Sequence, residues 1–142
     1  MKIYVINGVN LNLLGIREPQ LYGKISLSDI ESECRLIFPK TDLKFIQKNS
    51  EDELVEAVHE AKNSDAIVYN FGAFSHTSIA LLDALSLVKI LKIEVHISNV
   101  YAREGFRQRM LTARSAHGII TGLGKDVYKH AIEVIIQKLK DR

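Results

Sequence analysis

The sequence predicts an α/β protein with a flavodoxin-like, three-layer sandwich built on a five-stranded parallel sheet of order 2-1-3-4-5. Five short apolar runs alternate with helix-length amphipathic segments, which is the pattern of parallel strands buried on both faces. Right-handed crossovers between successive strands then give a doubly wound sheet. A length of 142 residues is typical of one domain, so residues 1–142 are expected to form a single unit.

Each strand is predicted from a run of apolar, mostly β-branched residues. These runs stay apolar along their length because helices cover both faces of a parallel sheet. In chain order they are Ile3–Ile6, Leu43–Ile46, Ala66–Tyr69, Ile93–Ile97 and Gly118–Thr121.

Four segments carry apolar residues at helical spacing. Two of them begin with the capping-box spacing, at Ser28–Glu31 and Ser50–Glu53, and the others cover about 78–88 and 125–140. Gly122 and Gly124 interrupt the chain before the last helix. The expected apolar faces are Ile30, Cys34 and Ile37; Leu54, Val58 and Ala61; Ile79, Leu82 and Leu85; and Val127, Ala131, Val134, Ile135 and Leu139.

Composition excludes several classes of protein. Lys and Arg number 19 against 17 Asp and Glu, and no basic block stands out, so a nucleic-acid partner is not expected. The single cysteine, Cys34, allows no disulfide within the chain. No apolar run approaches 18 residues, and Asn7 and Asn10 interrupt the apolar start, so neither a membrane span nor a signal peptide is expected. A cytoplasmic protein is the resulting expectation.

Polar residues follow three of the predicted strands at their carboxyl ends, where open parallel sheets bind ligands. The segments are 7–12 after the first strand, 70–78 after the third and 96–99 after the fourth. If these strands are neighbours, asparagine amides, hydroxyls and the imidazoles of His76 and His96 face one crevice. Such a pocket suits a small, oxygen-rich molecule. The connections 8–25 and 99–116 are long for this fold, and long loops are often functional.

Other sites known from this sheet arrangement fit poorly. A response regulator needs carboxylates where Asn7 and Asn70 stand, and no P-loop pattern occurs. Gly122-Leu123-Gly124 follows the last strand rather than the first, so it indicates a tight turn more than a dinucleotide site. His59-Glu60 lacks the second histidine of a metal-binding helix, so no metal is expected.

His96 is the strongest candidate for chemistry. Its ordinary interpretation is a satisfied core histidine. Glu94 lies two residues earlier, however, and therefore on the same strand face. A carboxylate beside an imidazole fixes its orientation and favours its charged form, which suits a general acid.

Four further features have ordinary interpretations as well as functional ones. Tyr22 lies in the first long loop with Arg17, and a nearby cation could lower its pKa from about 10, although most loop tyrosines do no chemistry. Ser75 or Thr77 is expected to cap the following helix, which leaves His76 available to a ligand. Asp83 is either a helix-surface charge or a contact with a neighbouring subunit. The arginine-rich run 103–109 is either a solvated face, which is the usual interpretation, or, because it directly follows the fourth strand, a source of one arginine that reaches the crevice.

Three long motifs resemble those of the type II 3-dehydroquinate dehydratase family. The resemblance extends over essentially the whole chain. Its motifs are Asn7–Gly15 with Arg17–Pro19 and Tyr22–Gly23, then Asn70–Ser78, then Glu94–Asn99 with Ala102–Glu104 and Phe106–Arg107.

The resemblance implies an anti elimination of water from 3-dehydroquinate through an enolate, giving 3-dehydroshikimate in the third step of the shikimate pathway. It implies no metal or cofactor. Carried over, Tyr22 is the base that Arg17 keeps ionised, His96 protonates the departing hydroxyl, Glu94 orients His96, and Asn10 helps to hold a water at the enolate oxygen.

The resemblance also assigns substrate contacts and an assembly. Asn70, His76 and Arg107 contact substrate oxygens, Ile97 and Ser98 bind the carboxylate through backbone N–H groups, and Asp83 approaches the site of an adjacent subunit. The family forms homododecamers built from trimers. The segment 8–25 is expected to close over the substrate as a lid.

Some positions depart from the family pattern. Val9 and Phe71 stand where proline is usual, Gly105 replaces a usual glutamate, and 108–110 replaces a stretch that normally includes serine. Loss of proline raises the entropy cost of fixing those turns but leaves the reacting groups in place. Two alternatives follow: a non-catalytic member that binds a ligand or partner, and a lyase or isomerase of a related cyclic acid.

Overall fold

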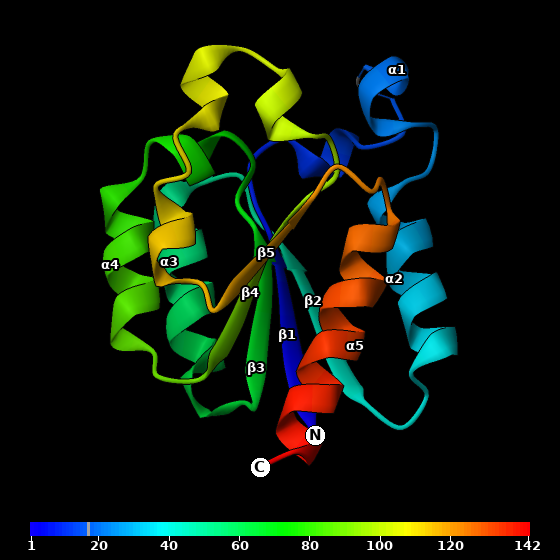
Figure 1. The fold of residues 1–142 in the computed structure, drawn as a ribbon, viewed down its shortest axis with the longest axis vertical. Helices are drawn as coiled ribbons and strands as arrows, with labels where there is room; N and C mark the ends of the chain where they lie inside the picture. Colours follow the sequence, from blue (N-terminus) through cyan, green and yellow to red (C-terminus); the bar gives the residue numbers. More distant parts are fainter. Residues whose placement is uncertain (17) are drawn as a thin grey trace.

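A computed structural model describes residues 1–16 and 18–142, and it has one parallel sheet between two layers of helices (Figure 1). The strand order is β2-β1-β3-β4-β5, with every neighbouring pair parallel, so the predicted topology is confirmed. The strands are β1 Lys2–Asn7, β2 Asp42–Gln47, β3 Ala66–Asn70, β4 Leu91–His96 and β5 Gly118–Thr121.

Two helices cover each face of the sheet (Figure 1). Helices α2 (Leu27–Ile37) and α5 (Asp126–Lys140) pack on one face, and α3 (Glu51–Glu60) and α4 (Ile79–Leu87) pack on the other. The short α1 (Pro19–Tyr22) lies beyond the carboxyl ends of the strands. Short 3-10 helices occupy the connections: η1 Leu11–Leu13, η2 Ala61–Asn63, η3 Gly72–His76, η4 Val100–Ala102, η5 Gly105–Gln108 and η6 Thr112–Ser115.

Alternation along the strands divides the interior into two cores. In β1, Ile3 and Val5 pack with α2 and α5, whereas Tyr4 and Ile6 pack with α3 and α4. All four are buried, as expected for a strand inside a parallel sheet. The same strand therefore supplies buried side chains to both cores. Burial of one large apolar side chain contributes about 1.5–3 kcal/mol to the free energy of folding.

The predicted helix caps need correction. Helix α2 is capped by Ser26, whose Oγ accepts from Asp29 N while Asp29 accepts from Ser26 N, so the box lies two residues before Ser28. Ser50 does precede α3, but its hydroxyl donates to Glu53 at 2.8 Å instead of accepting from the backbone. Ser78 caps α4 by accepting from Leu81 N at 3.0 Å, so the expected cap at Ser75 or Thr77 is wrong.

The apolar face of α4 also differs from the prediction. Leu81, Ala84 and Leu85 are buried against the sheet, while Ile79 is 65% and Leu87 is 75% exposed. Because this helix is apolar on nearly every side, periodicity could not select the inward face. In the other helices, Ile37 and Val134 were expected to be buried but are partly exposed, at 42% and 38%.

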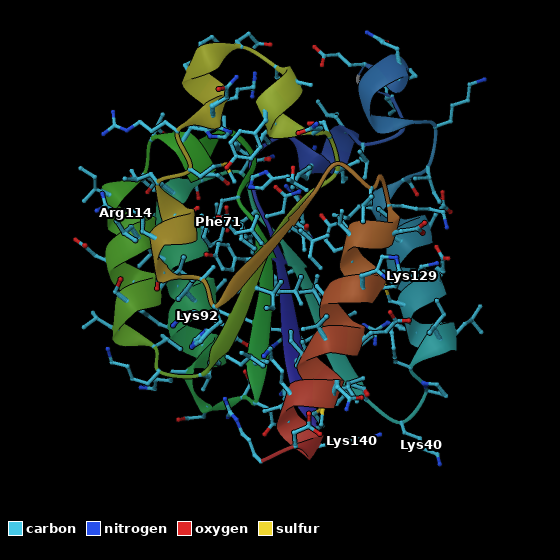
Figure 2. All side chains as sticks on the ribbon, viewed as in Figure 1. Lys40, Phe71, Lys92, Arg114, Lys129 and Lys140 are labelled. Atoms are coloured by element: carbon cyan, nitrogen blue, oxygen red, sulfur yellow. The ribbon has the colours of Figure 1, made fainter. Side chains whose placement is uncertain are left out.

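Two buried titratable groups lie in the interior away from the carboxyl edge. Cys34 is in the core beside α5, where burial raises the pKa of its thiol to about 11. Lys92, labelled in Figure 2, is buried on β4, and burial lowers the pKa of its amine. Its Nζ donates to the main-chain oxygen of Val88 at the end of α4.

No helix in the described residues has both the length and the apolar character needed to span a bilayer.

Gly8 permits a backbone crossing directly beneath the crevice. Its N–H donates to the Asn70 carbonyl at 2.7 Å, and a Cβ placed there would lie 2.4 Å from the Phe71 carbonyl oxygen. Phe71 is fully buried and its ring lies 4.9 Å from that of Tyr69, so this backbone has little room to move. The site therefore depends on glycine at position 8.

We expect Gly8→Ala to lower the free energy of unfolding by about 3 kcal/mol, because overpacking against backbone forces the strand ends apart. Urea unfolding followed by circular dichroism measures this change. Gly105→Ala is the matched control, since a Cβ there meets nothing within 4 Å, and its effect should stay within about 0.5 kcal/mol. Equal midpoints for the two variants would contradict the expectation.

Candidate active site

A narrow cavity lies at the carboxyl edge of the sheet, where β1, β3 and β4 end side by side. It encloses about 50 Å³. The predicted residues Asn10, Asn70, His76, His96, Ile97, Ser98 and Arg107 line it, together with Leu11, Gly72 and Ala73. The prediction that three strand ends and two imidazoles share one crevice is confirmed.

A carboxylate–imidazole pair forms one wall of this cavity. His96 Nε2 lies 3.1 Å from Glu94 Oε2, and the two side chains share a face because they are two residues apart on β4. Glu94 is fully buried and His96 is 6% exposed. The other ring nitrogen, His96 Nδ1, has no hydrogen-bond partner among the described residues. It is not one of their buried unpaired atoms, so it is accessible from the cavity. The pair can therefore deliver a proton to a ligand.

His76 faces His96 across the cavity, with ring centroids 6.0 Å apart and planes 28° apart. Its Nδ1 lies 2.9 Å from the Arg109 main-chain oxygen, and because a carbonyl only accepts, Nδ1 carries the hydrogen. Burial is the main cause that lowers the pKa of His76, so the neutral ring is favoured. Its Nε2 is then an acceptor, suited to a ligand hydroxyl.

Tyr128 of α5 ties the floor of the crevice together. Its hydroxyl donates to Asn7 Oδ1 at 2.5 Å and accepts from Asn70 Nδ2 at 3.3 Å. Asn70 Oδ1 accepts from Gly72 N at 3.1 Å, which holds the start of η3. Asn7 Nδ2 is buried without a partner in the described residues, so the floor keeps one unused donor.

Arg107 is the one Arg, Lys, Asp or Glu among the described residues that line the cavity, and further charged side chains follow β4 in the chain. Arg107 Nε donates to Glu104 at 2.7 Å, which also lowers the pKa of that carboxyl. Arg103 Nη1 donates to Ser98 Oγ at 3.4 Å, and its Nη2 lies 3.8 Å from Glu18 Oε2. The Arg103–Glu18 contact connects the segment after β4 to the residue that precedes α1.

Not every predicted site residue joins the crevice. Asp83 is an exposed residue of α4 and is not among the described residues that line the cavity, and its approach to the site of an adjacent subunit remains a prediction. Arg17 lies outside the described residues. Tyr22 ends α1, but its side chain lies outside the described part of the chain. The roles assigned to both remain predictions.

The sequence patterns did not predict a role in the site for Thr112, Tyr69 and Tyr128. Thr112 Oγ1 donates to Glu94 Oε1, and Tyr69 OH donates to the Thr112 main-chain oxygen at 2.8 Å. In the sequence, Tyr69 and Tyr128 have the spacing of ordinary core residues, and Thr112 lies in a connection without a motif. The sole signal was that Tyr69 and Tyr128 each bring a hydroxyl into an apolar setting, where it needs a partner.

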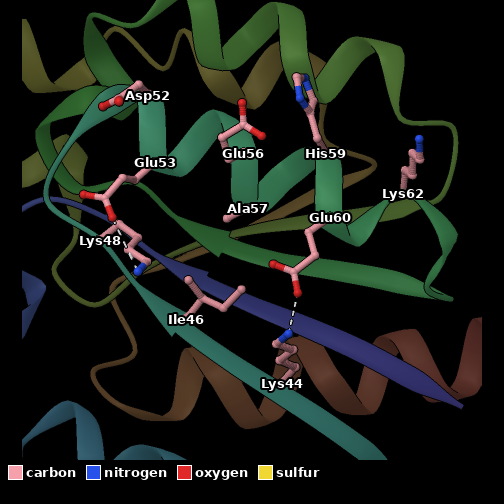
Figure 3. A pocket seen from close by; sticks show the side chains of 10 residues that line it. All are labelled: Lys44, Ile46, Lys48, Asp52, Glu53, Glu56, Ala57, His59, Glu60 and Lys62. Carbon is pink, nitrogen blue, oxygen red and sulfur yellow. Dashed lines mark hydrogen bonds and ion pairs between the residues drawn. The ribbon is translucent and has the colours of Figure 1, made fainter.

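A larger cavity of about 760 Å³ lies between β2 and α3, away from the crevice (Figure 3). Four of its charged side chains form two ion pairs: Lys44 with Glu60, and Lys48 with Glu53 at 3.4 Å. These pairs are half-exposed and contribute little to stability. Within the described residues no group of three or more His, Cys, Asp or Glu is arranged to hold a metal ion.

The fold and the crevice together define a flavodoxin-like α/β protein with an acid–base site at the carboxyl edge of its sheet. The family model described as "Dehydroquinase class II" matches residues 1–136. The chain therefore belongs to the class II dehydroquinase family.

Named relatives and solved structures agree with this assignment. A protein of Jannaschia sp. (strain CCS1) named 3-dehydroquinate dehydratase is 47% identical, over 99% of this chain and 97% of its own length. The type II dehydroquinase of Butyrivibrio crossotus superimposes with a TM-score of 0.92 at 41% identity, covering 95% of this chain and 97% of that one. That of Propionibacterium acnes gives 0.91 at 36% identity, covering 94% of each.

Proposed function

We propose that this protein is a hydro-lyase that dehydrates 3-dehydroquinate to 3-dehydroshikimate. Relatives across nearly the full length of the chain are named 3-dehydroquinate dehydratase. The observation that carries the proposal is the buried Glu94–His96 pair on the wall of a polar crevice. Neither the comparisons nor the crevice favours the non-catalytic alternative.

In the proposed reaction, the proton α to the ketone leaves first. Tyr22 is the base, with Arg17 keeping the phenolate ionised. The carbon–hydrogen bond electrons move into an enolate, whose oxygen is stabilised by a water that Asn10 helps to hold. Fixed dipoles stabilise such a developing charge best in a pocket with little water.

The hydroxyl then leaves from the opposite side. His96 donates a proton to the departing oxygen, the carbon–oxygen bond breaks, and the enolate electrons form the conjugated carbon–carbon double bond. Water is the only other product. Glu94 balances the charge of the imidazolium before the transfer and holds the ring in place afterwards.

The remaining crevice residues are assigned to binding. Asn70, His76 and Arg107 contact hydroxyl and carboxylate oxygens, and Ile97 and Ser98 bind the carboxylate mainly through backbone N–H groups. Because Glu104 already pairs with Arg107, binding of an anionic substrate competes with that ion pair.

Substrate entry requires movement of the segments around the mouth. A cavity of about 50 Å³ holds one or two waters, whereas a cyclic hydroxy acid needs several times that volume. We assign the opening to 8–25, because Asn10 and Leu11 of this segment line the cavity. Opening would break the contact between Glu18 Oε2 and Arg103 Nη2, which lie 3.8 Å apart.

The proposed activity predicts an ultraviolet signal. Purified protein incubated with 3-dehydroquinate should produce the absorbance of a conjugated enone, and added chelator should leave the rate unchanged. A panel of related cyclic acids run alongside tests the lyase or isomerase alternative. Absence of the enone signal from folded protein would contradict the proposed activity. A rate that falls with chelator would contradict a mechanism without metal.

The assembly, domain and location remain proposals as well. We propose a homododecamer built from trimers, in which Asp83 and the exposed Ile79 and Leu87 of α4 face a neighbouring subunit. Light scattering that shows a stable monomer or dimer would overturn this assembly.

We also propose that residues 1–142 form one domain, which limited proteolysis would check, and that the protein lies in the cytoplasm, which cell fractionation would check.

A further inference from the structure

Glu94 has a second partner behind the cavity wall. Thr112 Oγ1 donates to Glu94 Oε1, while Oε2 faces His96 Nε2 at 3.1 Å. Thr112 and Glu94 are both 0% exposed, so water cannot replace either hydrogen bond. Among the described residues these are the only two partners of the carboxylate.

The arrangement fixes the direction of each hydrogen bond. An ionised carboxylate only accepts, so the Thr112 hydroxyl must donate to it. Each oxygen of Glu94 is then committed to a different donor, which sets the plane of the carboxylate and points Oε2 at the imidazole. Hydrogen bonds to a charged group are the stronger kind, and a buried one has no alternative partner.

Tyr69 holds Thr112 in this position. Its hydroxyl donates to the Thr112 main-chain oxygen at 2.8 Å and links the start of η6 to β3. Burial first, and the charge of Glu94 second, raise the pKa of Tyr69, so the phenol stays protonated and continues to donate. The chain of contacts therefore runs from β3 through Thr112 and Glu94 to His96.

We propose that Thr112 is a positioning residue for the dehydration: its hydroxyl fixes the plane of the Glu94 carboxylate, so that Oε2 holds the His96 imidazole in the orientation needed for proton transfer. This inference rests on the proposed function. Without the hydroxyl, Oε1 is a buried oxygen with no donor among the described residues, and the plane of the carboxylate is no longer fixed. The imidazole that Oε2 orients is then less well placed to protonate the departing hydroxyl.

Other titratable and charged groups near the pair do not take the place of this hydroxyl. Tyr69 approaches from β3 and binds Thr112 rather than Glu94. His76 approaches from η3, with its ring 6.0 Å from that of His96, and the charge of Arg107 on η5 acts on His76. None of them donates to Glu94 in the described part of the chain.

The test compares Thr112→Val, which removes the hydroxyl at nearly constant shape, with Thr112→Ser, which keeps it. We expect kcat of Thr112→Val to fall about tenfold to a hundredfold, since general acid catalysis contributes about 10²–10⁴-fold, while KM changes less than about threefold. Thr112→Ser should stay within about threefold of wild type. Thr41→Val makes the same change before β2, at the other end of the sheet, and should leave kcat and KM unchanged, because the Thr41 hydroxyl has no hydrogen bond in the described part of the chain.

Nitrogen NMR of His96 supplies a readout that does not depend on turnover. The ring nitrogen shifts of Thr112→Val should differ from wild type, because the hydrogen bond between Nε2 and Glu94 changes, and those of Thr112→Ser should match wild type. Wild-type kcat and wild-type nitrogen shifts in Thr112→Val would overturn the inference. If wild type does not dehydrate 3-dehydroquinate but the shifts still change, the proposed function fails and the positioning role stands.

Tyr69→Phe tests the same chain of contacts one step further away. Loss of its hydrogen bond to the Thr112 carbonyl should lower kcat about threefold to tenfold and shift the His96 signals in the same direction. This variant also keeps the inference testable if Thr112→Val does not fold, as judged by circular dichroism. Unchanged kcat and unchanged shifts in a folded Tyr69→Phe would show that η6 does not position Glu94.

Discussion

His96→Asn should lower kcat for 3-dehydroquinate about 10²–10⁴-fold, which is the contribution of a well-placed general acid. Asparagine keeps an N–H beside Glu94 but has no proton to release to the departing hydroxyl. The Glu94 carboxylate, which is 0% exposed, then also loses its charge-balancing partner. Steady-state kinetics from the enone absorbance measures the loss, and thermal unfolding shows whether the fold survives.

The surface offers a matched control for this substitution. His130 Nδ1 lies 3.1 Å from Glu133 Oε2 on α5, a histidine–carboxylate pair with the same separation but exposed to solvent. His130→Asn should leave kcat and KM unchanged, because exposed pairs contribute little. A His96→Asn enzyme that kept more than about a tenth of wild-type kcat would contradict the assignment of His96 as the acid.

Tyr22→Phe should abolish turnover, with a fall in kcat of about 10³-fold or more, because it removes the only base assigned to the α proton. The substitution removes one oxygen at the end of α1, so the fold should be retained. The same variant should also lose exchange of the α proton of the substrate with deuterium from solvent, which NMR follows directly. Loss of both signals identifies the failed step as proton abstraction rather than departure of the hydroxyl.

Tyr101→Phe is the corresponding control. Tyr101 lies in η4 after β4 and its side chain is 56% exposed, so it loses the same oxygen near the site without a catalytic role. Its kcat should remain within about twofold of wild type. Full activity in Tyr22→Phe would show that another group removes the proton.

The sheet and the core of the site were predictable from local patterns. Apolar runs located all five strands, and the position of polar residues at their carboxyl ends located the crevice. The Glu94–His96 contact follows from the two-residue period of a strand. These features depend on short stretches of sequence plus one rule of topology, which is why they were accessible.

The remaining features depend on which side chains meet across the fold. Thr112 reaches Glu94 only because η6 packs beside β4 and β3, and no spacing in the chain encodes that meeting. Helix α4 is apolar on most sides, so its inward face is chosen by the sheet. The cap of α2 was misplaced because Ser26-x-x-Asp29 and Ser28-x-x-Glu31 are both capping boxes by pattern, and only the chain's path from the loop selects the first.

The hydrogen bond from Tyr128 to Asn7 joins residues 121 positions apart, almost the two ends of the chain. Contacts of such long sequence separation form late, because closing the intervening loop costs entropy before any stabilisation is gained. The floor of the crevice can therefore be completed only after α5 docks on the sheet. During synthesis, a chain that has already made β1, β3 and β4 still lacks this floor, and recovery of activity on refolding should follow the docking of the C-terminal helix rather than the formation of the sheet.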